Sequence, residues 1–436
     1  MPQRAPSSIR PLLALSALLL LTVVLPLAGA EEAWPPAKDQ SRSAELAPIG
    51  RPADIFRHGV RPAWGYAAPQ QDTFIVVHPK AEHAQAPLYV VLHSAGHDVW
   101  SCVKCTSQVG NHDIYRSPDD FYALYLDCSA NRGDWWWGGF PNGDANLAKK
   151  NAGGEPMPVE KRVLDCIRFV MATYPIDPER VYLSGNSMGG SGTLGIGIRN
   201  GDLFAAIKAN VPAGIEHASN RMYFPPATPP AGFPPADPPV VVDYSAQNDK
   251  WSAGHERFVQ AMNTSHYALY FYWGPYGHAN NSASIKTIND LIDSFDWLSI
   301  RRSEPYAVFT NASCNSALPW PDHLDDKAPG QLNAFFRWKT VSLAKERIVL
   351  SLVLASAAEL ATSKFTVPAE ASADVSLRRV QALKVKPRQA LPWTYGAASG
   401  TVTADTAGLI TIPKLTITGT PTVLTVGAAT ATGAGK

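Results

Sequence analysis

The chain has 436 residues, of which 45% are hydrophobic and 17% charged, and this size and composition suit a globular protein of two domains. The formal net charge of +1 at pH 7 gives no electrostatic case for binding nucleic acid or an anionic membrane surface. The function is therefore to be read from local motifs rather than from bulk charge.

The first 30 residues are typical of a signal peptide. Arg4 and Arg10 precede the apolar run PLLALSALLLLTVVLPLAG, and Ala28-Gly29-Ala30 has the small-residue pattern of a cleavage site. A retained membrane anchor is the alternative, but Pro26 and the acidic, proline-rich sequel EEAWPPAK favour cleavage. We expect a signal peptide at residues 1–30, a secreted or periplasmic mature protein, and no stable membrane insertion after cleavage.

The alternation of strand-like and helix-like segments runs from about residue 72 to residue 300. TFIVVHP, PLYVVLHSAG and FYALYLDCS are short apolar runs, as expected for strands covered on both faces. PVEKRVLDCIRFVMATYP has Val163, Ile167 and Val170 at helical spacing, and Pro158 suits a first helical turn. We therefore expect a mostly parallel sheet with helices on both faces, in a domain spanning residues 31–302.

The cysteines are five in number, so at least one thiol lacks a partner within the chain. An exported protein can form disulfides. WSCVKC contains a Cys-x-x-Cys pair, but no second pair and no thioredoxin-like pattern surrounds it. We expect a structural bridge from Cys102 or Cys105, with Cys128 as a candidate partner, rather than redox or zinc chemistry, and no metal site.

A proline-rich segment, RMYFPPATPPAGFPPADPP at residues 221–239, interrupts the alternation. So much proline excludes both a helix and a sheet ladder, which leaves an extended loop. The loop is either a passive surface insertion or one wall of a substrate site, because connections that leave the carboxyl ends of strands often line ligand sites.

Beyond about Ser303 the pattern changes to short strands separated by turn residues. NAFFRWKTV, RIVLSLVLAS, VSLRRVQALKVK and GLITIPKLTITG show little helical periodicity, and LITIPKLTI alternates like a half-exposed strand. We expect a β-sandwich domain at residues 303–426, joined to the first domain near Arg301–Pro305, and a flexible tail at residues 427–436.

The stretch RVYLSGNSMGGSG contains the pattern G-x-S-x-G at residues 185–189, between a predicted strand and a predicted helix. The alternative is an ordinary glycine-rich turn. In this context, however, flanking glycines allow a corner that exposes the hydroxyl of Ser187 at the sheet edge, with the positive end of the next helix pointing at it. We therefore predict that Ser187 is a nucleophile.

A nucleophilic serine needs an adjacent base, and that base needs a third group to hold its tautomer. On a sheet of this kind the acid and then the histidine follow the serine along the chain. VVVDYSAQNDKW supplies Asp249 and YFYWGPYGHANN supplies His278, each in a loop after a strand. Asp243 competes as the acid but falls within the strand, and His255 competes as the base but reads as a solvated helix face. We expect Ser187, Asp249 and His278 to be catalytic.

The oxyanion of an acyl-transfer intermediate needs hydrogen-bond donors that are already in place. The amide of Met188, directly after the nucleophile, is one predicted donor. The second is expected from the loop VVLHSAGHDVW, at the backbone amide of Ser94 or Ala95.

The span from about Asp72 to Ile300 resembles the α/β-hydrolase superfamily. RVYLSGNSMGG, followed by Asp249 and His278, is similar to the secreted serine esterases grouped with polyhydroxybutyrate depolymerases, feruloyl esterases and prolyl-oligopeptidase-like hydrolases. The resemblance implies a triad of Ser187, Asp249 and His278, and no cofactor. HSAGH departs from the His-Gly pair or glycine run of many relatives, and the region beyond Ser303 resembles no close family.

Substrate contacts are expected from DWWWGGF, whose three successive tryptophans cannot all face one core. Either one or two of them pack beneath a neighbouring loop, or their indole faces are exposed to bind an aromatic acyl group or a sugar ring. Trp136 and Trp137 are the candidate substrate-binding residues here, together with His93 and Asn186.

The leading prediction is a secreted serine esterase that acts on feruloyl or acetyl esters of plant polysaccharides, or on polyesters. Its partner would be an ester substrate, polymeric or small. One alternative is a serine peptidase of the prolyl-oligopeptidase type, although no propeller-like repeat is present. The other is a non-catalytic polymer-binding protein, against which the ordered Ser, Asp and His groups argue.

Overall fold

The computed structural model describes residues 34, 36–66, 70–107, 115–128, 134–137, 156–222, 237–278, 285, 291–322, 329–360 and 365–427. The predicted signal peptide, most of the proline-rich segment and the predicted tail from residue 428 lie outside these described residues. Within the described ranges, none of the helices combines the length and the apolar character needed to cross a membrane.

The larger part of the molecule is built on one ten-stranded sheet with the strand order β1-β2-β3-β5-β4-β6-β7-β8-β9-β11. Its strands are β1 (Ala37–Lys38), β2 (Ala53–Arg57), β3 (Thr73–Val77), β4 (Ala86–Leu92), β5 (Tyr122–Leu126), β6 (Ile176–Asn186), β7 (Ala206–Asn210), β8 (Val240–Ala246), β9 (Leu269–Gly274) and β11 (Gly330–Leu332). The strands from β5 to β9 pair in parallel, while β1, β2, β3 and β11 are antiparallel additions. The expected mostly parallel α/β-hydrolase sheet is therefore confirmed.

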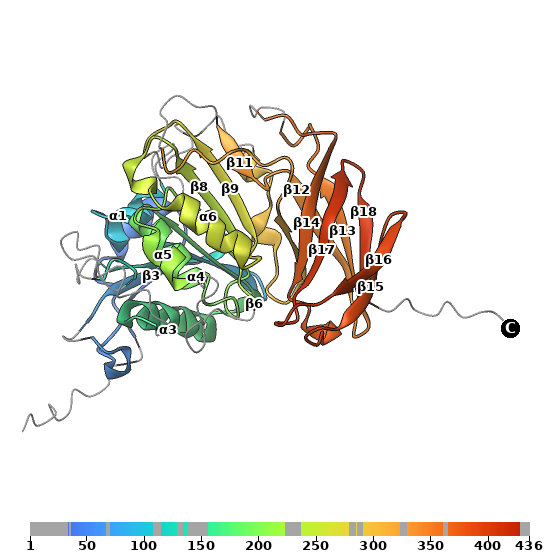
Figure 1. Ribbon diagram of the computed structural model, residues 1–436. Helices are drawn as coiled ribbons and strands as arrows, with labels where there is room; N and C mark the ends of the chain where they lie inside the picture. Colours follow the sequence, from blue (N-terminus) through green and yellow to red (C-terminus); the bar gives the residue numbers. More distant parts are fainter. Residues whose placement is uncertain are drawn as a thin grey trace, which may run out of the picture.

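Both faces of this sheet are covered, as the apolar runs predicted. Along β4, Tyr89 and Val91 enter one core while Leu88, Val90 and Leu92 enter the other. The helix α1 (Val99–Cys105) packs on the Tyr89 face. On the opposite face lie α3 (Pro158–Thr173), α4 (Met188–Gly197), α5 (Glu216–Arg221) and α6 (His255–Thr264). Figure 1 shows α3, α4 and α6 side by side over this face.

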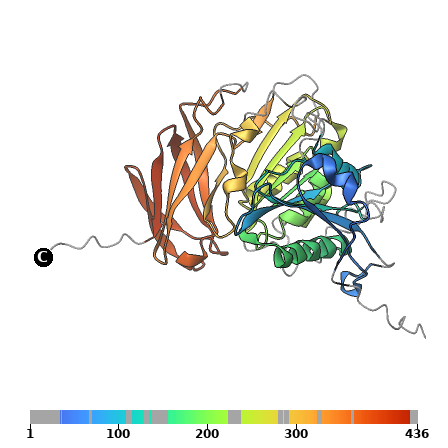
Figure 2. The ribbon, with the colours of Figure 1, turned by 180° about the vertical axis from the view of Figure 1, so that it is seen from behind.

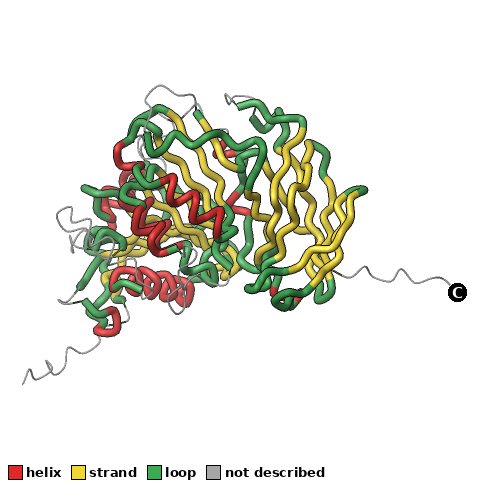
Figure 3. The backbone as a smooth tube through the Cα atoms, in the orientation of Figure 1, coloured by secondary structure: helices red, strands yellow, loops and turns green. Residues whose placement is uncertain are grey.

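The rest of the chain folds into two antiparallel sheets that pack face to face as a β-sandwich. One sheet has the order β10-β14-β17 and the other β12-β13-β18-β15-β16. The strands are β10 (Tyr306–Thr310), β12 (Phe336–Leu343), β13 (Arg347–Leu354), β14 (Glu370–Arg378), β15 (Ala390–Tyr395), β16 (Ala398–Thr403), β17 (Ile410–Thr418) and β18 (Thr422–Gly427). Figure 3 shows this part as almost wholly strand beside the mixed α/β part. The expected sandwich is confirmed, except that β11 returns to the large sheet and pairs with β9.

The β-sandwich lies beside the α/β part (Figure 2), and hydrogen bonds attach it to the amino ends of parallel strands. The hydroxyl of Tyr306 donates to the carbonyl oxygen of Pro238, two residues before β8, at 2.6 Å. The guanidinium of Arg379 donates to the carbonyl oxygen of Ala205, just before β7, at 3.1 Å. Arg378 donates to the carbonyl oxygen of Ser265, shortly before β9, at 2.6 Å. The carboxyl ends of these strands, where a catalytic site belongs in such a sheet, therefore face away from the sandwich.

The expected disulfide is wrong. All five cysteines lie within the described residues, and they form no disulfide bond. Cys102 and Cys105 point from α1 into the core on one face of the large sheet, whereas Cys128 belongs to the core on the other face. Burial raises the pKa of Cys166 to about 12, so that thiol behaves as a small apolar side chain.

Candidate active site

Ser187 occupies the sharp turn between β6 and α4. Its φ of 55° and ψ of −113° are strained for a residue with a side chain. The turn is tight because its glycines lack a Cβ. A Cβ on Gly185 would lie 2.2 Å from the carbonyl oxygen of Gly189, and a Cβ on Gly189 would lie 2.0 Å from the carbonyl oxygen of Leu92. The strand, strained turn and helix expected for a G-x-S-x-G nucleophile are thus all present.

We expect Gly189→Ala to destabilise the fold by about 3 kcal/mol, because its methyl group would meet backbone atoms of β4 that cannot rotate away. The free energy of unfolding, measured in urea, checks this value. Gly419→Ala is the matched control, since a Cβ there meets no atom within 4 Å. A variant as stable as the control would contradict the close approach of α4 to β4.

The three predicted catalytic side chains meet at the carboxyl ends of β6, β8 and β9. Nε2 of His278 lies 2.8 Å from Oγ of Ser187, and Nδ1 of His278 lies 2.5 Å from Oδ2 of Asp249. Asp249 is 4% exposed, whereas the side chain of His278 is 31% exposed. The arrangement gives a solvent-accessible base between a serine hydroxyl and a buried carboxylate.

Hydrogen bonds fix the carboxylate of Asp249 within its loop and connect that loop to the one that carries His278. Oδ1 of Asp249 accepts the amide of Trp251 at 2.9 Å, which fixes the carboxylate. The amide of Gly277 donates to Oδ1 of Asn248 at 2.7 Å. The residue before His278 is thus hydrogen-bonded to the residue before Asp249. These bonds set the imidazole orientation that a general base requires.

The competing acid and base form a separate buried pair. Nε2 of His255 lies 3.2 Å from Oδ2 of Asp243, and both side chains are fully buried. The expectation that His255 is solvated on a helix face is therefore wrong. Its ring packs against both Phe271 and Trp320, with ring centroids 5.0 and 4.9 Å away, and its Nδ1 lies 2.6 Å from the carbonyl oxygen of Ser252. This pair supports the loop that follows Asp249 rather than reaching Ser187.

Of the three predicted oxyanion donors, one backbone amide already donates a hydrogen bond within the described part of the protein and two do not. Ser94 donates its backbone amide to the hydroxyl of Tyr115 at 3.0 Å, and that hydroxyl donates to Oγ of Ser94 at 2.8 Å. Ser94 is therefore withdrawn as a donor. Among the described residues, the amides of Met188 and Ala95 have no hydrogen-bond partner, and Ala95 is exposed. These two amides are the pair left to bind an oxyanion.

His93 and Asn186 are 1% and 0% exposed. Contrary to the prediction, neither side chain is presented to a substrate. His93 instead supports the oxyanion loop. Its Nδ1 lies 2.9 Å from the carbonyl oxygen of Ser94, and its Nε2 accepts the amide of Cys128 at 3.2 Å. The imidazole therefore links the loop after β4 to the end of β5.

The exposed indole faces expected of Trp136 and Trp137 are also absent, since the two side chains are 0% and 2% exposed. Nε1 of Trp136 donates to the carbonyl oxygen of His93 at 2.9 Å. Trp137 stacks on His217 with ring centroids 4.5 Å apart. The alternative, that tryptophans of this loop pack under their neighbours, holds for both, because their large apolar rings gain more from burial, Trp136 beside α4 and Trp137 against His217 of α5.

An exposed indole in the loop that carries Asp249 is that of Trp251, at 48% exposure. The carbonyl oxygen of Trp251 accepts the amide of Gly214 at 3.4 Å, and the neighbouring amide of Ala213 donates to the carbonyl oxygen of Ser187. The loop of Trp251 thus borders the loop that contacts the nucleophile. The sequence signal that could have found it is its place two residues after Asp249 in VVVDYSAQNDKW.

A buried arginine, Arg162 of α3, supports the region behind the triad. Its guanidinium lies 3.1 Å from Oδ2 of Asp72 and 3.4 Å from Oδ2 of Asp134, and it donates to the carbonyl oxygen of Asp127 at 2.8 Å. Although burial disfavours its charge, these carboxylates raise the pKa of Arg162 well above its usual value. Arg162 thereby joins the end of β5 to the start of the tryptophan loop.

Within the described ranges, no cluster of three or more histidine, cysteine, aspartate or glutamate side chains could hold a metal ion. The residues that converge here are a serine, an imidazole, a carboxylate and two amides. Together they have the groups needed for nucleophilic acyl transfer.

No family model and no curated protein sequence matches the chain. Solved structures similar to it include the fluorophosphonate-binding serine hydrolase F of Staphylococcus aureus, with 14% identity, coverage of 57% of this chain and 98% of that chain, and a TM-score of 0.37. A ferulic acid esterase from Anaeromyces mucronatus has 14% identity, coverage of 60% and 92%, and a TM-score of 0.38. An S-formylglutathione hydrolase from Agrobacterium tumefaciens has 15% identity, coverage of 60% and 97%, and a TM-score of 0.39. At scores this low the likeness carries no argument of its own, and the fold assignment rests on the strand order and the turn at Ser187.

Proposed function

We propose that the protein is a secreted serine hydrolase of carboxylic esters that works through an acyl-enzyme. The observation that carries this proposal is the continuous contact from Ser187 Oγ through His278 to Asp249, at 2.8 and 2.5 Å. Strain in the backbone of Ser187 supports it, because such strain persists where a side chain is held for chemistry.

In the first half of the reaction, Nε2 of His278 takes the proton of the Ser187 hydroxyl as Oγ attacks the ester carbonyl carbon. The carboxylate of Asp249 accepts the Nδ1–H bond and stabilises the imidazolium. The carbonyl oxygen, now negative, receives hydrogen bonds from the amides of Met188 and Ala95. His278 then gives the proton to the departing alkoxide, which leaves as an alcohol, and Ser187 remains acylated.

In the second half, water replaces the alcohol. His278 removes a proton from the water molecule as its oxygen attacks the acyl carbon, and the proton returns to Oγ of Ser187 when the acid leaves. The partial exposure of His278 supports this step, because solvent reaches the base directly.

The substrates that we propose are feruloyl or acetyl esters of plant polysaccharides, or polyesters. The exposed ring of Trp251 supports an aromatic or sugar group beside the triad, since a flat indole face binds flat apolar surfaces. The β-sandwich lies at the opposite ends of the strands and so leaves the triad uncapped by that domain. An open site favours esters on large polymers over the peptides that a capped prolyl-oligopeptidase-type enzyme would take.

A matched substrate panel tests this proposal. The purified protein is given feruloyl and acetyl groups, each as an ester and as the corresponding amide, together with feruloylated xylan and a polyester film. We expect ester cleavage to exceed amide cleavage by several orders of magnitude in kcat/KM. Faster amide cleavage would establish the peptidase alternative, and no turnover of any substrate would establish the non-catalytic alternative.

A further inference from the structure

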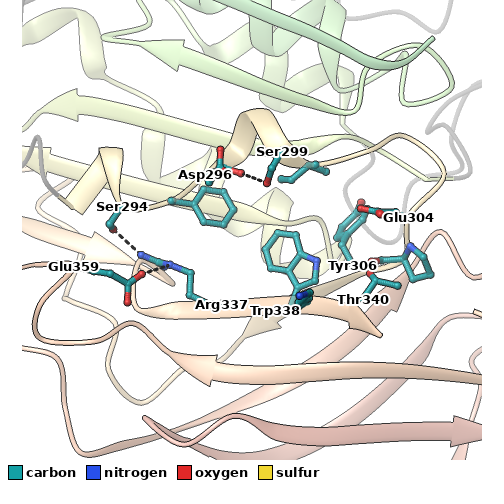
Figure 4. A pocket seen from close by; sticks show the side chains of 13 residues that line it. Ser294, Asp296, Ser299, Glu304, Tyr306, Arg337, Trp338, Thr340 and Glu359 are labelled. Carbon is teal, nitrogen blue, oxygen red and sulfur yellow. Dashed lines mark hydrogen bonds and ion pairs between the residues drawn. The ribbon is translucent and has the colours of Figure 1, made fainter. Parts of the chain in front are cut away.

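A cavity lies between the two parts of the molecule, and none of the triad residues lines it. It has a volume of about 410 Å³, within the roughly 300–1,000 Å³ of small-molecule sites. Figure 4 shows its lining, which comes from the segment Ser294–Tyr306 on one side and from β12 and Glu359 on the other. Both domains therefore contribute to it.

The floor of this cavity is aromatic and fixed in position. The half-buried indole of Trp338 packs against Phe295, with ring centroids 5.6 Å apart, and against Tyr306, at 6.3 Å. Phe295 in turn stacks on Tyr270 at 3.9 Å. Figure 4 shows the indole of Trp338 in the lining, between Arg337 and Tyr306. A flat apolar surface is thus presented without further ordering.

The rim is polar and nearly balanced in charge. Two basic side chains, Arg337 and Lys339, face three acidic ones, Asp296, Glu304 and Glu359. Arg337 is already engaged, because it donates to Oγ of Ser294 at 2.6 Å and to the carbonyl oxygen of Ala334 at 2.7 Å, and lies 3.8 Å from Glu359. The rim therefore offers both donors and acceptors, and its acidic side chains outnumber its basic ones, which does not favour an anion.

We propose that this cavity binds a neutral sugar unit of a polysaccharide chain. One face of a pyranose ring carries C–H groups that pack on an indole, while its hydroxyls both donate and accept hydrogen bonds, as this aromatic floor and mixed rim require. The proposal goes beyond ester hydrolysis, and binding here does not depend on the chemistry of Ser187.

The position of the cavity makes it an anchoring site rather than part of the catalytic cleft. Tyr306, in its lining, is bonded to Pro238 at the amino end of β8, while Asp249 follows the carboxyl end of that strand. Seven extended residues separate these ends by about 20 Å. This anchoring role rests on the proposed function: a polysaccharide chain held in the cavity would raise the local concentration of its ester groups near the triad.

Binding of xylohexaose and cellohexaose, measured by isothermal titration calorimetry, tests the proposal. We expect one of them to bind, and Trp338→Ala to weaken that binding by at least about tenfold through loss of the stacking surface. Trp393→Ala is the matched control, because Trp393 is a half-buried tryptophan of β15 in the same sheet, separated from β12 by β13 and β18. It should bind like the parent protein.

Two further variants are measured in the same binding assay. Glu304→Gln changes only an exposed rim group and should also weaken binding, which covers the case in which Trp338→Ala does not fold. Ser187→Ala should bind the oligosaccharide as tightly as the parent, so that a failure of the proposed esterase function leaves this result intact. The proposal is overturned if neither oligosaccharide binds, or if both cavity variants bind as tightly as Trp393→Ala.

Discussion

Ser187→Ala is expected to lower kcat for a soluble aryl ester by at least about 10⁴-fold while KM changes little. The reason is that the hydroxyl oxygen 2.8 Å from Nε2 of His278 forms the new covalent bond, and no other group can supply it. Steady-state kinetics measure the loss. His278→Ala should cost a similar factor, and the double variant should be no worse than either single one, because the two groups act in one step.

The matched control for these variants is His255→Gln, which alters the other histidine of the region without touching the triad. Its Nε2 contacts Asp243 and its Nδ1 contacts the carbonyl oxygen of Ser252, so we expect a loss of stability with a much smaller loss of kcat. If His255→Gln were as inactive as His278→Ala at full folding, the base would have been assigned to the wrong imidazole.

Arg162→Met is expected to lower the free energy of unfolding by about 3–5 kcal/mol. It would leave the buried carboxylates of Asp72 and Asp134 without their cation, and the carbonyl oxygen of Asp127 without its donor. Denaturation in urea measures the change. The deficit should shrink as the pH is lowered, because protonation of a buried carboxylate in the folded state removes the uncompensated charge.

The control for this variant lies on the same helix. Arg168 faces solvent at 59% exposure and lies 3.5 Å from Asp165, so Arg168→Met should cost less than about 0.5 kcal/mol. Equal losses for the two arginines would show that the buried network contributes no more than a surface ion pair.

The parts that could be predicted from the sequence are those set by short-range patterns. Continuous apolar runs specified buried strands such as β4, and the spacing of Val163, Ile167 and Val170 specified α3. The pattern around Ser187 predicted the strained turn, because only glycine fits where a Cβ would meet backbone within 2.2 Å. Asp249 and His278 were selected by their place after successive parallel strands, whose carboxyl ends share one edge of the sheet.

The parts that could not be predicted depend on contacts between distant segments. Three tryptophans in a row do not reveal that Trp136 bonds to the carbonyl of His93, 43 residues away. His255 looks like a surface residue until Trp320 covers its ring from another segment. The same holds for β11, whose three residues carry too little pattern to show that they extend the sheet at β9.

The central claim, that Asp249 and His278 make the hydroxyl of Ser187 a nucleophile, is tested most directly by fluorophosphonate labelling followed by peptide mass spectrometry. One phosphonyl group per molecule is expected, on the peptide containing Ser187, with none on Ser187→Ala and much slower labelling of His278→Ala. An unlabelled parent protein, or a label on a different serine, would contradict the claim.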